Sequence, residues 1–304
     1  MGYRRADLTP DAVARQIQDL MSENYVAPDY LGLFQEVFNA QYQIERKLRA
    51  KNLYPPIDKR ETDKRREQGL PIIDPDKLQF GEKELSDLLQ EICSILSRYN
   101  VNGSSVASRL LDAKGSGELS LCELARKAML DNREYMRWVS EKMGENEEEI
   151  IFVAKALAVP FLRVCAKRLN RKTDLTLIQT NICPICGGKP IMAKLREGDG
   201  KRILECSLCN TQWGVERLRC PFCGNEDQNT LGFFFMEEQS AYRVDKCDKC
   251  KRYIKTVDER KKAEDKLKAL PIEDVATLYL DILAEKEGYQ SIKNHWGEEG
   301  KLNG

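Results

Sequence analysis

Histidine is almost absent from this sequence: His295 is the only one among 304 residues. A catalytic histidine normally comes with an orienting partner, so we expect no base or ligand role for this single residue near the end of the chain. A surplus of basic residues is also missing, because 49 lysine and arginine residues are balanced by 49 aspartate and glutamate residues. Domains dedicated to nucleic acid show such a surplus, and the composition therefore argues against that class of protein.

Long apolar runs are missing as well. No stretch of about 18 consecutive apolar residues occurs, so we expect no membrane span. Arg4 and Arg5 lie close to the start, but no apolar segment follows them, which argues against a Sec or twin-arginine signal. The first half of the chain also shows no paired carboxylates, no Ser/His/Asp set and no glycine-rich phosphate loop. We therefore expect this half to be a scaffold rather than an enzymatic domain.

Cysteine, in contrast, is abundant, and eight of the eleven cysteines form Cys-x-x-Cys pairs. The four pairs are Cys183/Cys186, Cys206/Cys209, Cys220/Cys223 and Cys247/Cys250. A tight turn within such a pair brings both sulfurs to one metal ion, at about 2.3 Å. Two pairs have the form Cys-Pro-x-Cys-Gly, in which proline presets φ for the turn and glycine accepts a left-handed conformation.

The pairs are arranged as two similar units, each with a pair, a spacer and a second pair. Four sulfurs form a closed tetrahedral site, so we predict two metal ions, the first bound by the first two pairs and the second by the last two. Tetrahedral sulfur suits both zinc and iron, and a structural zinc and a redox-active iron both stay open. In a reducing compartment this spacing indicates metal rather than disulfides. Cys93, Cys122 and Cys165 lie in helical patterns and are expected to be small buried apolar residues.

The first half of the chain shows helical periodicity. Thr9-Pro10-Asp11 marks a helix start, Ser120 and Glu123 form a capping box, and Pro160 should kink or break a helix. Residues 58–68 predict an exposed loop or a solvated helix. One helix is expected to start at Thr9. Four further helices are expected over about 29–51, 81–99, 120–143 and 147–169, and Asn146 should cap the last of them. Their apolar stripes predict a helical bundle.

The cysteine region has a different character, with short β-type runs at 201–205, 231–235 and 252–255. Hairpins with so little core need a metal to fold. A last helix is predicted from Pro271 to Gly288. The expected fold is α+β and multidomain, with rubredoxin-like, zinc-ribbon-type modules. Its parts are a helical domain (1–178), a first metal module (179–214), a second metal module (215–257) and a C-terminal helix and tail (258–304).

Several stretches resemble the FdhE family of formate dehydrogenase accessory proteins. They are CPICGG from Cys183, LECSLCNTQW ending at Trp213, RLRCPFCG from Arg217, CDKCKRYIK from Cys247 and DVATLYLD from Asp274. The resemblance is specific over about residues 181–288 and weaker over the helical half. It implies a helical domain followed by two rubredoxin-like modules, with all eight paired cysteines as ligands of iron or zinc.

The resemblance also implies a cytoplasmic chaperone for the assembly or activation of exported respiratory formate dehydrogenases. The expected partner is the immature catalytic subunit, with no nucleic acid; a homodimer is an alternative to the monomer. Two other functions stay open: a zinc-ribbon nucleic-acid-binding protein and a rubredoxin-like electron carrier.

Two further groups of residues surround the predicted metal sites. At least two of Phe233, Phe234 and Phe235 are expected to pack inside, although all three could form an exposed docking edge. Seven basic residues are expected to compensate the negative charge of the thiolates, with a contact surface for an acidic partner as the alternative. These are Lys189, Lys194, Arg196, Lys201, Arg202, Arg217 and Arg219.

Overall fold

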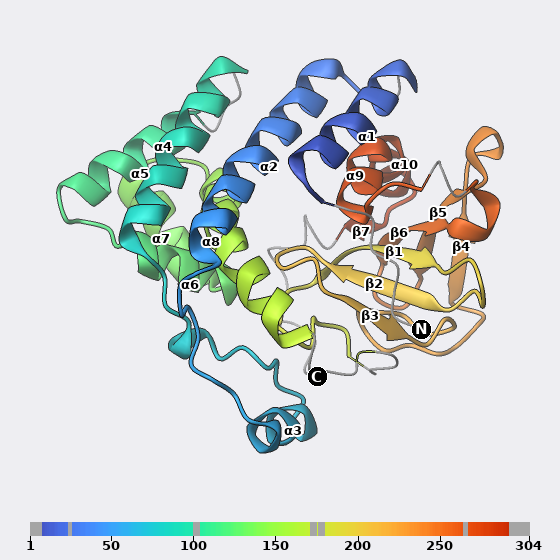
Figure 1. Cartoon of the computed structure of the whole chain (residues 1–304). Helices are drawn as coiled ribbons and strands as arrows, with labels where there is room; N and C mark the ends of the chain where they lie inside the picture. Colours follow the sequence, from blue (N-terminus) through green and yellow to red (C-terminus); the bar gives the residue numbers. More distant parts are fainter. Residues whose placement is uncertain are drawn as a thin grey trace. The chain divides into compact units, whose positions relative to one another are not determined.

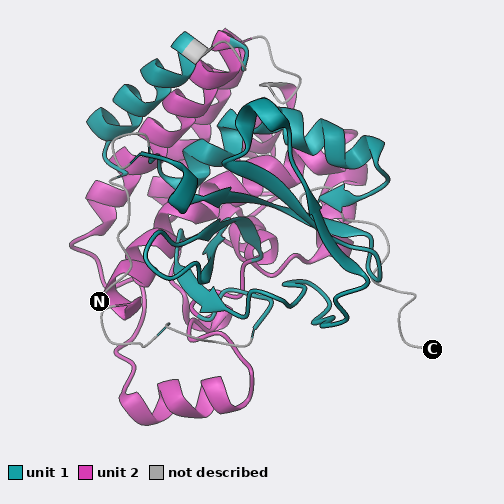
Figure 2. Ribbon diagram, turned by 90° about the vertical axis from the view of Figure 1, so that its right-hand side faces the viewer, with its two compact units in different colours: residues 1–27, 174–184, 189–304 teal, residues 28–173, 185–188 magenta. Residues whose placement is uncertain are grey.

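The computed structural model covers the whole chain and describes residues 8–23, 26–99, 104–170, 175, 180–263 and 267–291. The chain divides into two compact units (Figure 2). The sheet unit comprises Met1–Ala27, Asp174–Pro184 and Lys189–Gly304, and the helical unit comprises Pro28–Thr173 and Ile185–Gly188. The four domain boundaries expected from the sequence stay a prediction. His295 and the tail after it lie outside the described residues.

Helices α1 to α8 precede the strands along the chain, and α9 and α10 follow strand β6 (Figure 1). The α-helices are α1 (Pro10–Glu23), α2 (Pro28–Leu48), α3 (Lys59–Glu67), α4 (Glu82–Arg98), α5 (Ser104–Gly115), α6 (Leu121–Met129), α7 (Arg133–Met143), α8 (Glu147–Leu169), α9 (Leu270–Ala276) and α10 (Leu278–Lys286). The strands are β1 (Pro190–Leu195), β2 (Arg202–Cys206), β3 (Gln212–Val215), β4 (Leu231–Phe234), β5 (Tyr242–Cys247), β6 (Arg252–Asp258) and β7 (Gln290–Ser291). No described helix is both long and apolar enough to cross a membrane.

Helix α8 is the centre of the helical unit. It packs against α2, α4, α5, α6 and α7, and nearly every residue from Ile150 to Ala166 is buried. Its start follows from the sequence, because Asn146 accepts hydrogen bonds from the backbone N–H groups of Glu148 and Glu149 and three glutamates lie in the first turn. Acidic residues at this end are stabilised by the helix dipole. The predicted helical, bundle-like unit is confirmed.

Helix α8 runs through Pro160 without a break. Proline lacks a backbone N–H, so the carbonyl four residues earlier, that of Ala156, has no helical donor. The Gln41 side chain of α2 replaces that donor, with Nε2 at 3.0 Å from the Ala156 oxygen in a buried position. A long-range side chain therefore satisfies the carbonyl that Pro160 leaves without a partner.

Two expected helices are each interrupted. The helix expected over 120–143 is α6 and α7, separated at Asp131, whose φ is +51°, and Asn132, whose side chain caps α7. The helix expected over 271–288 is α9 and α10, separated at Thr277. Of the two alternatives for residues 58–68, a helix forms, namely α3, which has no buried residue.

Within the described residues the strands form one seven-stranded sheet in the order β3-β2-β1-β6-β5-β4, with β7 beside β6. The first three strands form one antiparallel meander and β4, β5 and β6 form another. The two meanders are joined by parallel pairing of β1 with β6, from Ala193↔Thr256 to Leu195↔Asp258. The two predicted modules therefore share one sheet, which the cysteine spacing alone did not indicate.

Helix α10 covers one face of the β4–β6 meander. Val244 and Tyr253 are buried there against Leu280 and Ala284. On the same face Lys255 is only 2% exposed, and its Nζ lies 2.6 Å from the Asp281 carboxylate and donates to the Asp274 carbonyl at 2.7 Å. This buried ion pair attaches both C-terminal helices to the second meander.

The contact between Gln41 and Ala156 gives a testable prediction. Gln41→Leu should destabilise the helical unit by about 1–3 kcal/mol, because a buried carbonyl loses its donor. Urea unfolding followed by far-ultraviolet circular dichroism measures this change. Gln43→Leu is the matched control: Gln43 lies on the same helix but is exposed, so its replacement should change the free energy of unfolding by less than about 0.5 kcal/mol. Equal effects of the two substitutions would contradict the role given to Gln41.

Candidate metal centres

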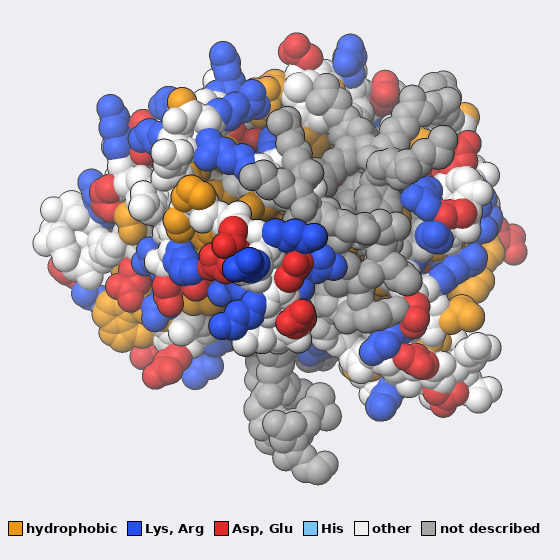
Figure 3. All heavy atoms as spheres, turned by 60° about the horizontal axis from the view of Figure 1, so that its bottom comes forward, with side chains coloured by type: hydrophobic (Ala, Val, Ile, Leu, Met, Phe, Trp, Pro, Cys, Tyr) orange, Lys and Arg blue, Asp and Glu red, His pale blue; other side chains and the backbone are white. Residues whose placement is uncertain are grey.

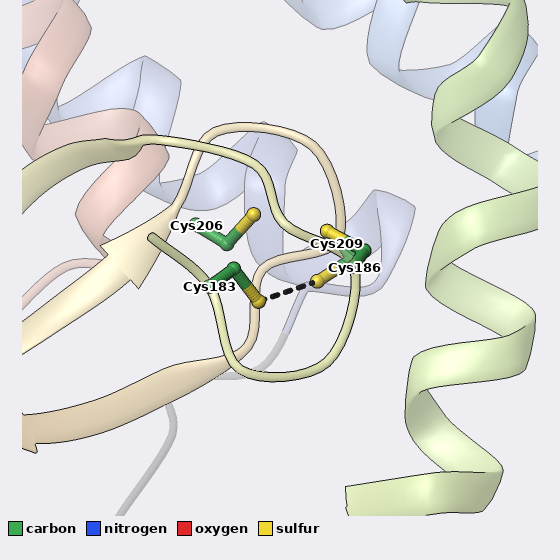
Figure 4. Close-up of side chains that lie close together, drawn as sticks. All are labelled: Cys183, Cys186, Cys206 and Cys209. Atoms are coloured by element: carbon green, nitrogen blue, oxygen red, sulfur yellow. Dashed lines mark hydrogen bonds between the residues drawn. The ribbon is translucent and has the colours of Figure 1, made fainter. Parts of the chain in front are cut away.

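The first four paired cysteines come together in the structure. The Sγ atoms of Cys183, Cys186, Cys206 and Cys209 all lie within 4.8 Å of one another, and the four side chains converge on a common point (Figure 4). The sulfurs of Cys183 and Cys209 are 3.6 Å apart. All four residues are buried. We call this group the first cluster.

The last four paired cysteines form a second cluster of the same kind, again with all Sγ atoms within 4.8 Å. The sulfurs of Cys220 and Cys250 are 3.7 Å apart, and those of Cys223 and Cys247 are 3.8 Å apart. This cluster is more open than the first, because Cys223 is exposed and Cys250 is half-buried.

These sulfur–sulfur distances suit a metal site. With metal–sulfur bonds of about 2.3 Å, tetrahedral geometry places the sulfurs about 3.8 Å from one another. A disulfide would instead require about 2.05 Å. The two clusters could therefore each hold one tetrahedrally coordinated ion, and the predicted grouping of the eight cysteines into two sets of four is confirmed.

The residue after the second cysteine of every pair has a positive φ. It is Gly187 (+80°) and Gly224 (+69°) in the two Cys-Pro-x-Cys-Gly turns, as the sequence predicted, and Asn210 (+55°) and Lys251 (+54°) in the other two. Only glycine adopts this conformation without steric cost, while asparagine tolerates it better than most residues. The four turns thus share one geometry, which the sequence motif shows in only two of them.

Polar groups also point at the sulfurs. The backbone N–H of Leu208 donates to Cys206 Sγ at 3.4 Å, and Asn225 Nδ2 lies 3.7 Å from Cys247 Sγ. Donors aimed at a sulfur favour its thiolate form. Asn225 was not expected to take part, and only its position next to the Cys-Pro-x-Cys-Gly turn could have indicated it.

The thiols of the second cluster cannot all ionise together without a cation. A hydrogen bond from Cys250 lowers the pKa of Cys220 to about 5. The same contact raises the pKa of Cys250, and burial, together with the charge of Cys220, raises that of Cys223. A divalent cation removes this conflict, since metal binding displaces the protons.

Both clusters lie at the same end of the shared sheet. The first cluster flanks the start of β1 and the second flanks the start of β6, and these two strands run parallel. Strand β7 pairs with Arg252 and Tyr253 of β6, while β1 pairs only with Thr256 to Asp258. Since β5 occupies the other edge of β6, β7 fills the edge of β6 that β1 leaves free near the clusters.

Five of the seven basic residues predicted to compensate the thiolates pair with carboxylates, namely Lys194, Arg196, Lys201, Arg202 and Arg219. Lys194 pairs with Glu259 at 2.9 Å, Arg196 Nε donates to Asp199 at 2.8 Å, and Arg202 pairs with Asp245. Of the three cysteines outside the Cys-x-x-Cys motifs, Cys165 is buried as expected, whereas Cys93 and Cys122 are half-buried. Burial raises the pKa of the Cys122 thiol to about 11, and its contact with Glu82 acts in the same direction.

The cysteine region matches two described protein domains. Residues 182–217 match "FdhE, central domain" and residues 204–295 match "FdhE, C-terminal domain". A "Protein FdhE homolog" of Aquifex aeolicus is 34% identical over 172 residues, which are 55% of this chain and 59% of that protein. "Protein FdhE" of Escherichia coli O1:K1 is 37% identical over 114 residues, which are 36% of this chain and 35% of that protein. The chain thus matches less than two thirds of the length of either relative.

A solved structure extends the likeness of fold to the helices. The crystal structure of the FdhE protein from Pseudomonas aeruginosa superposes with a TM-score of 0.62 over 95% of this chain and 97% of that one, at 21% sequence identity. The overall fold is therefore shared. The predicted resemblance is confirmed: residues 182–295 of the chain match the central and C-terminal domains of FdhE.

Proposed function

We propose that the eight paired cysteines bind two metal ions, one in each cluster. The observation that carries this proposal is the sulfur spacing of 3.6 to 3.8 Å, which suits zinc or iron in four-thiolate coordination. Four protein ligands leave no open position for a substrate. The ions would therefore stabilise the sheet unit rather than catalyse a reaction.

We further propose that the protein serves the maturation of a formate dehydrogenase as a cytoplasmic accessory protein without enzymatic activity of its own. The match to the FdhE domains supports this role. Four cysteine ligands in each cluster would leave no coordination position for a substrate, which is consistent with binding rather than catalysis. The client would be the immature catalytic subunit, held until its cofactors are in place. Both signs of charge are interspersed on the face seen in Figure 3, which favours a protein client over nucleic acid.

Removal of the gene tests this role. Formate dehydrogenase activity in the deletion strain should fall to background, and a plasmid copy of the gene should restore it. The same strain should keep transcript levels of the dehydrogenase unchanged, since the proposed action follows synthesis. Normal activity in the deletion strain would exclude the proposed function.

Substitution of a single ligand tests the metal sites. Cys206→Ser removes one of four sulfurs from the first cluster, so metal content should fall from about two ions per chain to about one, and the sheet unit should lose stability. The helical unit should stay folded. Metal analysis and circular dichroism of the purified protein measure both effects, with Cys93→Ser as a control outside the clusters. Unchanged metal content in Cys206→Ser would show that the grouping is wrong.

The different exposure of the clusters predicts the order of metal release. A chelator should remove the ion of the second cluster first, because Cys223 is exposed, and that of the buried first cluster more slowly. Stopped-flow absorbance with a chromogenic chelator should therefore show two phases, and Cys223→Ser should abolish the faster one. A single phase for both ions would contradict this assignment.

A further inference from the structure

The second meander has one face that helix α10 does not cover. Strand alternation places Phe234 and Val244, which are directly paired, against α10. It turns their neighbours Phe233 and Asp245, also paired, to the opposite side. Arg243 lies two residues from Asp245 along β5 and therefore shares that side. This opposite side carries a cavity of about 280 Å³ beside the second cluster.

Arginine dominates the charged lining of this cavity. Its arginines are Arg202, Arg217, Arg219, Arg243 and Arg252. Asp245 is the only acidic residue in the lining within the described part of the chain. We call this surface the arginine face. An excess of positive charge around a partly enclosed space attracts anions.

Asp245, the one carboxylate in this lining, already interacts with three neighbouring side chains. Asp245 accepts from Arg202 Nη2 at 2.9 Å and from Arg243 Nη2 at 3.0 Å, and the Thr256 hydroxyl donates to it at 2.6 Å. The Nε atoms of Arg202 and Arg243 are buried and have no hydrogen-bond acceptor among the described residues. Burial lowers the pKa of Arg243, and the positive charges of Arg202 and Arg217 act in the same direction. Arg202 and Arg243 therefore each keep one buried donor without a described acceptor.

Arg217 and Arg219 line the same cavity and add further positive charge to the arginine face. Arg217 is exposed and forms no ion pair with any residue that the structure describes. Arg219 pairs at 2.9 Å with Glu226, whose side chain is 63% exposed. Such exposed pairs contribute little, so both guanidinium groups can engage an incoming carboxylate, which arginine binds with two parallel hydrogen bonds.

Apolar side chains border the same face. Leu218 is 62% exposed, Phe233 54% and Phe235 43%; of the three phenylalanines Phe234 packs against the core, whereas Phe233 and Phe235 stack on each other at the surface of the hairpin. The Arg243 guanidinium lies over the Phe233 ring at 4.6 Å, which holds both side chains in place. Strand β4 stands at the end of the strand order, and an edge strand can pair with an added strand.

We propose that the arginine face binds an extended acidic segment of a partner protein. Its carboxylates enter the cavity, its apolar side chains contact Leu218 and Phe233, and its backbone pairs with β4. A free phosphate would use the arginines but gain nothing from the exposed apolar side chains and the strand edge, which is why a peptide is favoured. The identity of the partner protein rests on the proposed function, but the binding of an acidic segment to the arginine face does not.

Fluorescence anisotropy with the metal-loaded full chain tests this binding. The probe is a fluorescein-labelled peptide of alternating glutamate and leucine, and its control has glutamine in place of glutamate. The glutamate peptide should bind with an affinity that falls as salt concentration rises, and the glutamine peptide should bind at least about tenfold more weakly, since each lost ion pair contributes severalfold.

Arg217→Gln should weaken binding of the glutamate peptide by about two- to fivefold, the range for one partly exposed ion pair. Metal content should not change, because Arg217 is not one of the cysteine ligands and forms no ion pair with a described residue. Arg66→Gln is the matched control, since Arg66 is an exposed residue of α3 and should leave binding unchanged.

Equal affinity for the two peptides, or equal effects of Arg217→Gln and Arg66→Gln, would overturn the proposal. Binding of inorganic phosphate in calorimetry, without binding of the glutamate peptide, would also overturn it. A gene deletion that leaves formate dehydrogenase active while the purified protein still binds the peptide would remove the proposed function and keep this inference.

Discussion

The structure depends on placing four thiols within 4.8 Å of one another twice in one sheet. Such a group is unfavourable without a cation, because each thiolate raises the pKa of its neighbours. A metal ion bound as proposed would replace this repulsion with the attraction of all four thiolates to one cation. The strands are correspondingly short, and the four turns share a positive φ after the second cysteine. The cysteine spacing, the turn geometry and the proposed metal binding thus all follow from the need to bring four sulfurs together.

The two clusters differ in their surroundings, and this difference suggests a division of labour. The first is buried throughout, and Trp213, four residues after its last cysteine, is fully buried and donates from Nε1 to the Thr180 carbonyl. The second is more open and shares lining residues with the arginine face. In this account the first cluster secures the sheet, while the second secures a hairpin whose outer face meets a partner. Parallel pairing of β1 with β6 holds the two at one end of the sheet.

The sequence predicted those features that depend on local patterns. The spacing of the cysteines predicted the two clusters, and Asn146 predicted the start of α8. Features that depend on distant residues could not be predicted: Gln41 satisfies the carbonyl that Pro160 leaves without a donor, and the β1–β6 pairing joins the modules. The break at Asp131 was missed because the apolar periodicity continues across it. The shared role of Asp245 for two arginines required β2 and β5 to be placed in one sheet.

X-ray absorption spectroscopy of the anaerobically purified protein tests the central claim most directly, combined with metal analysis of the same sample. The account predicts about two zinc or iron ions per chain, each with four sulfur neighbours at about 2.3 Å and no oxygen or nitrogen in the first shell. Oxygen or nitrogen ligands, or a protein that is folded and active in maturation without metal, would contradict it.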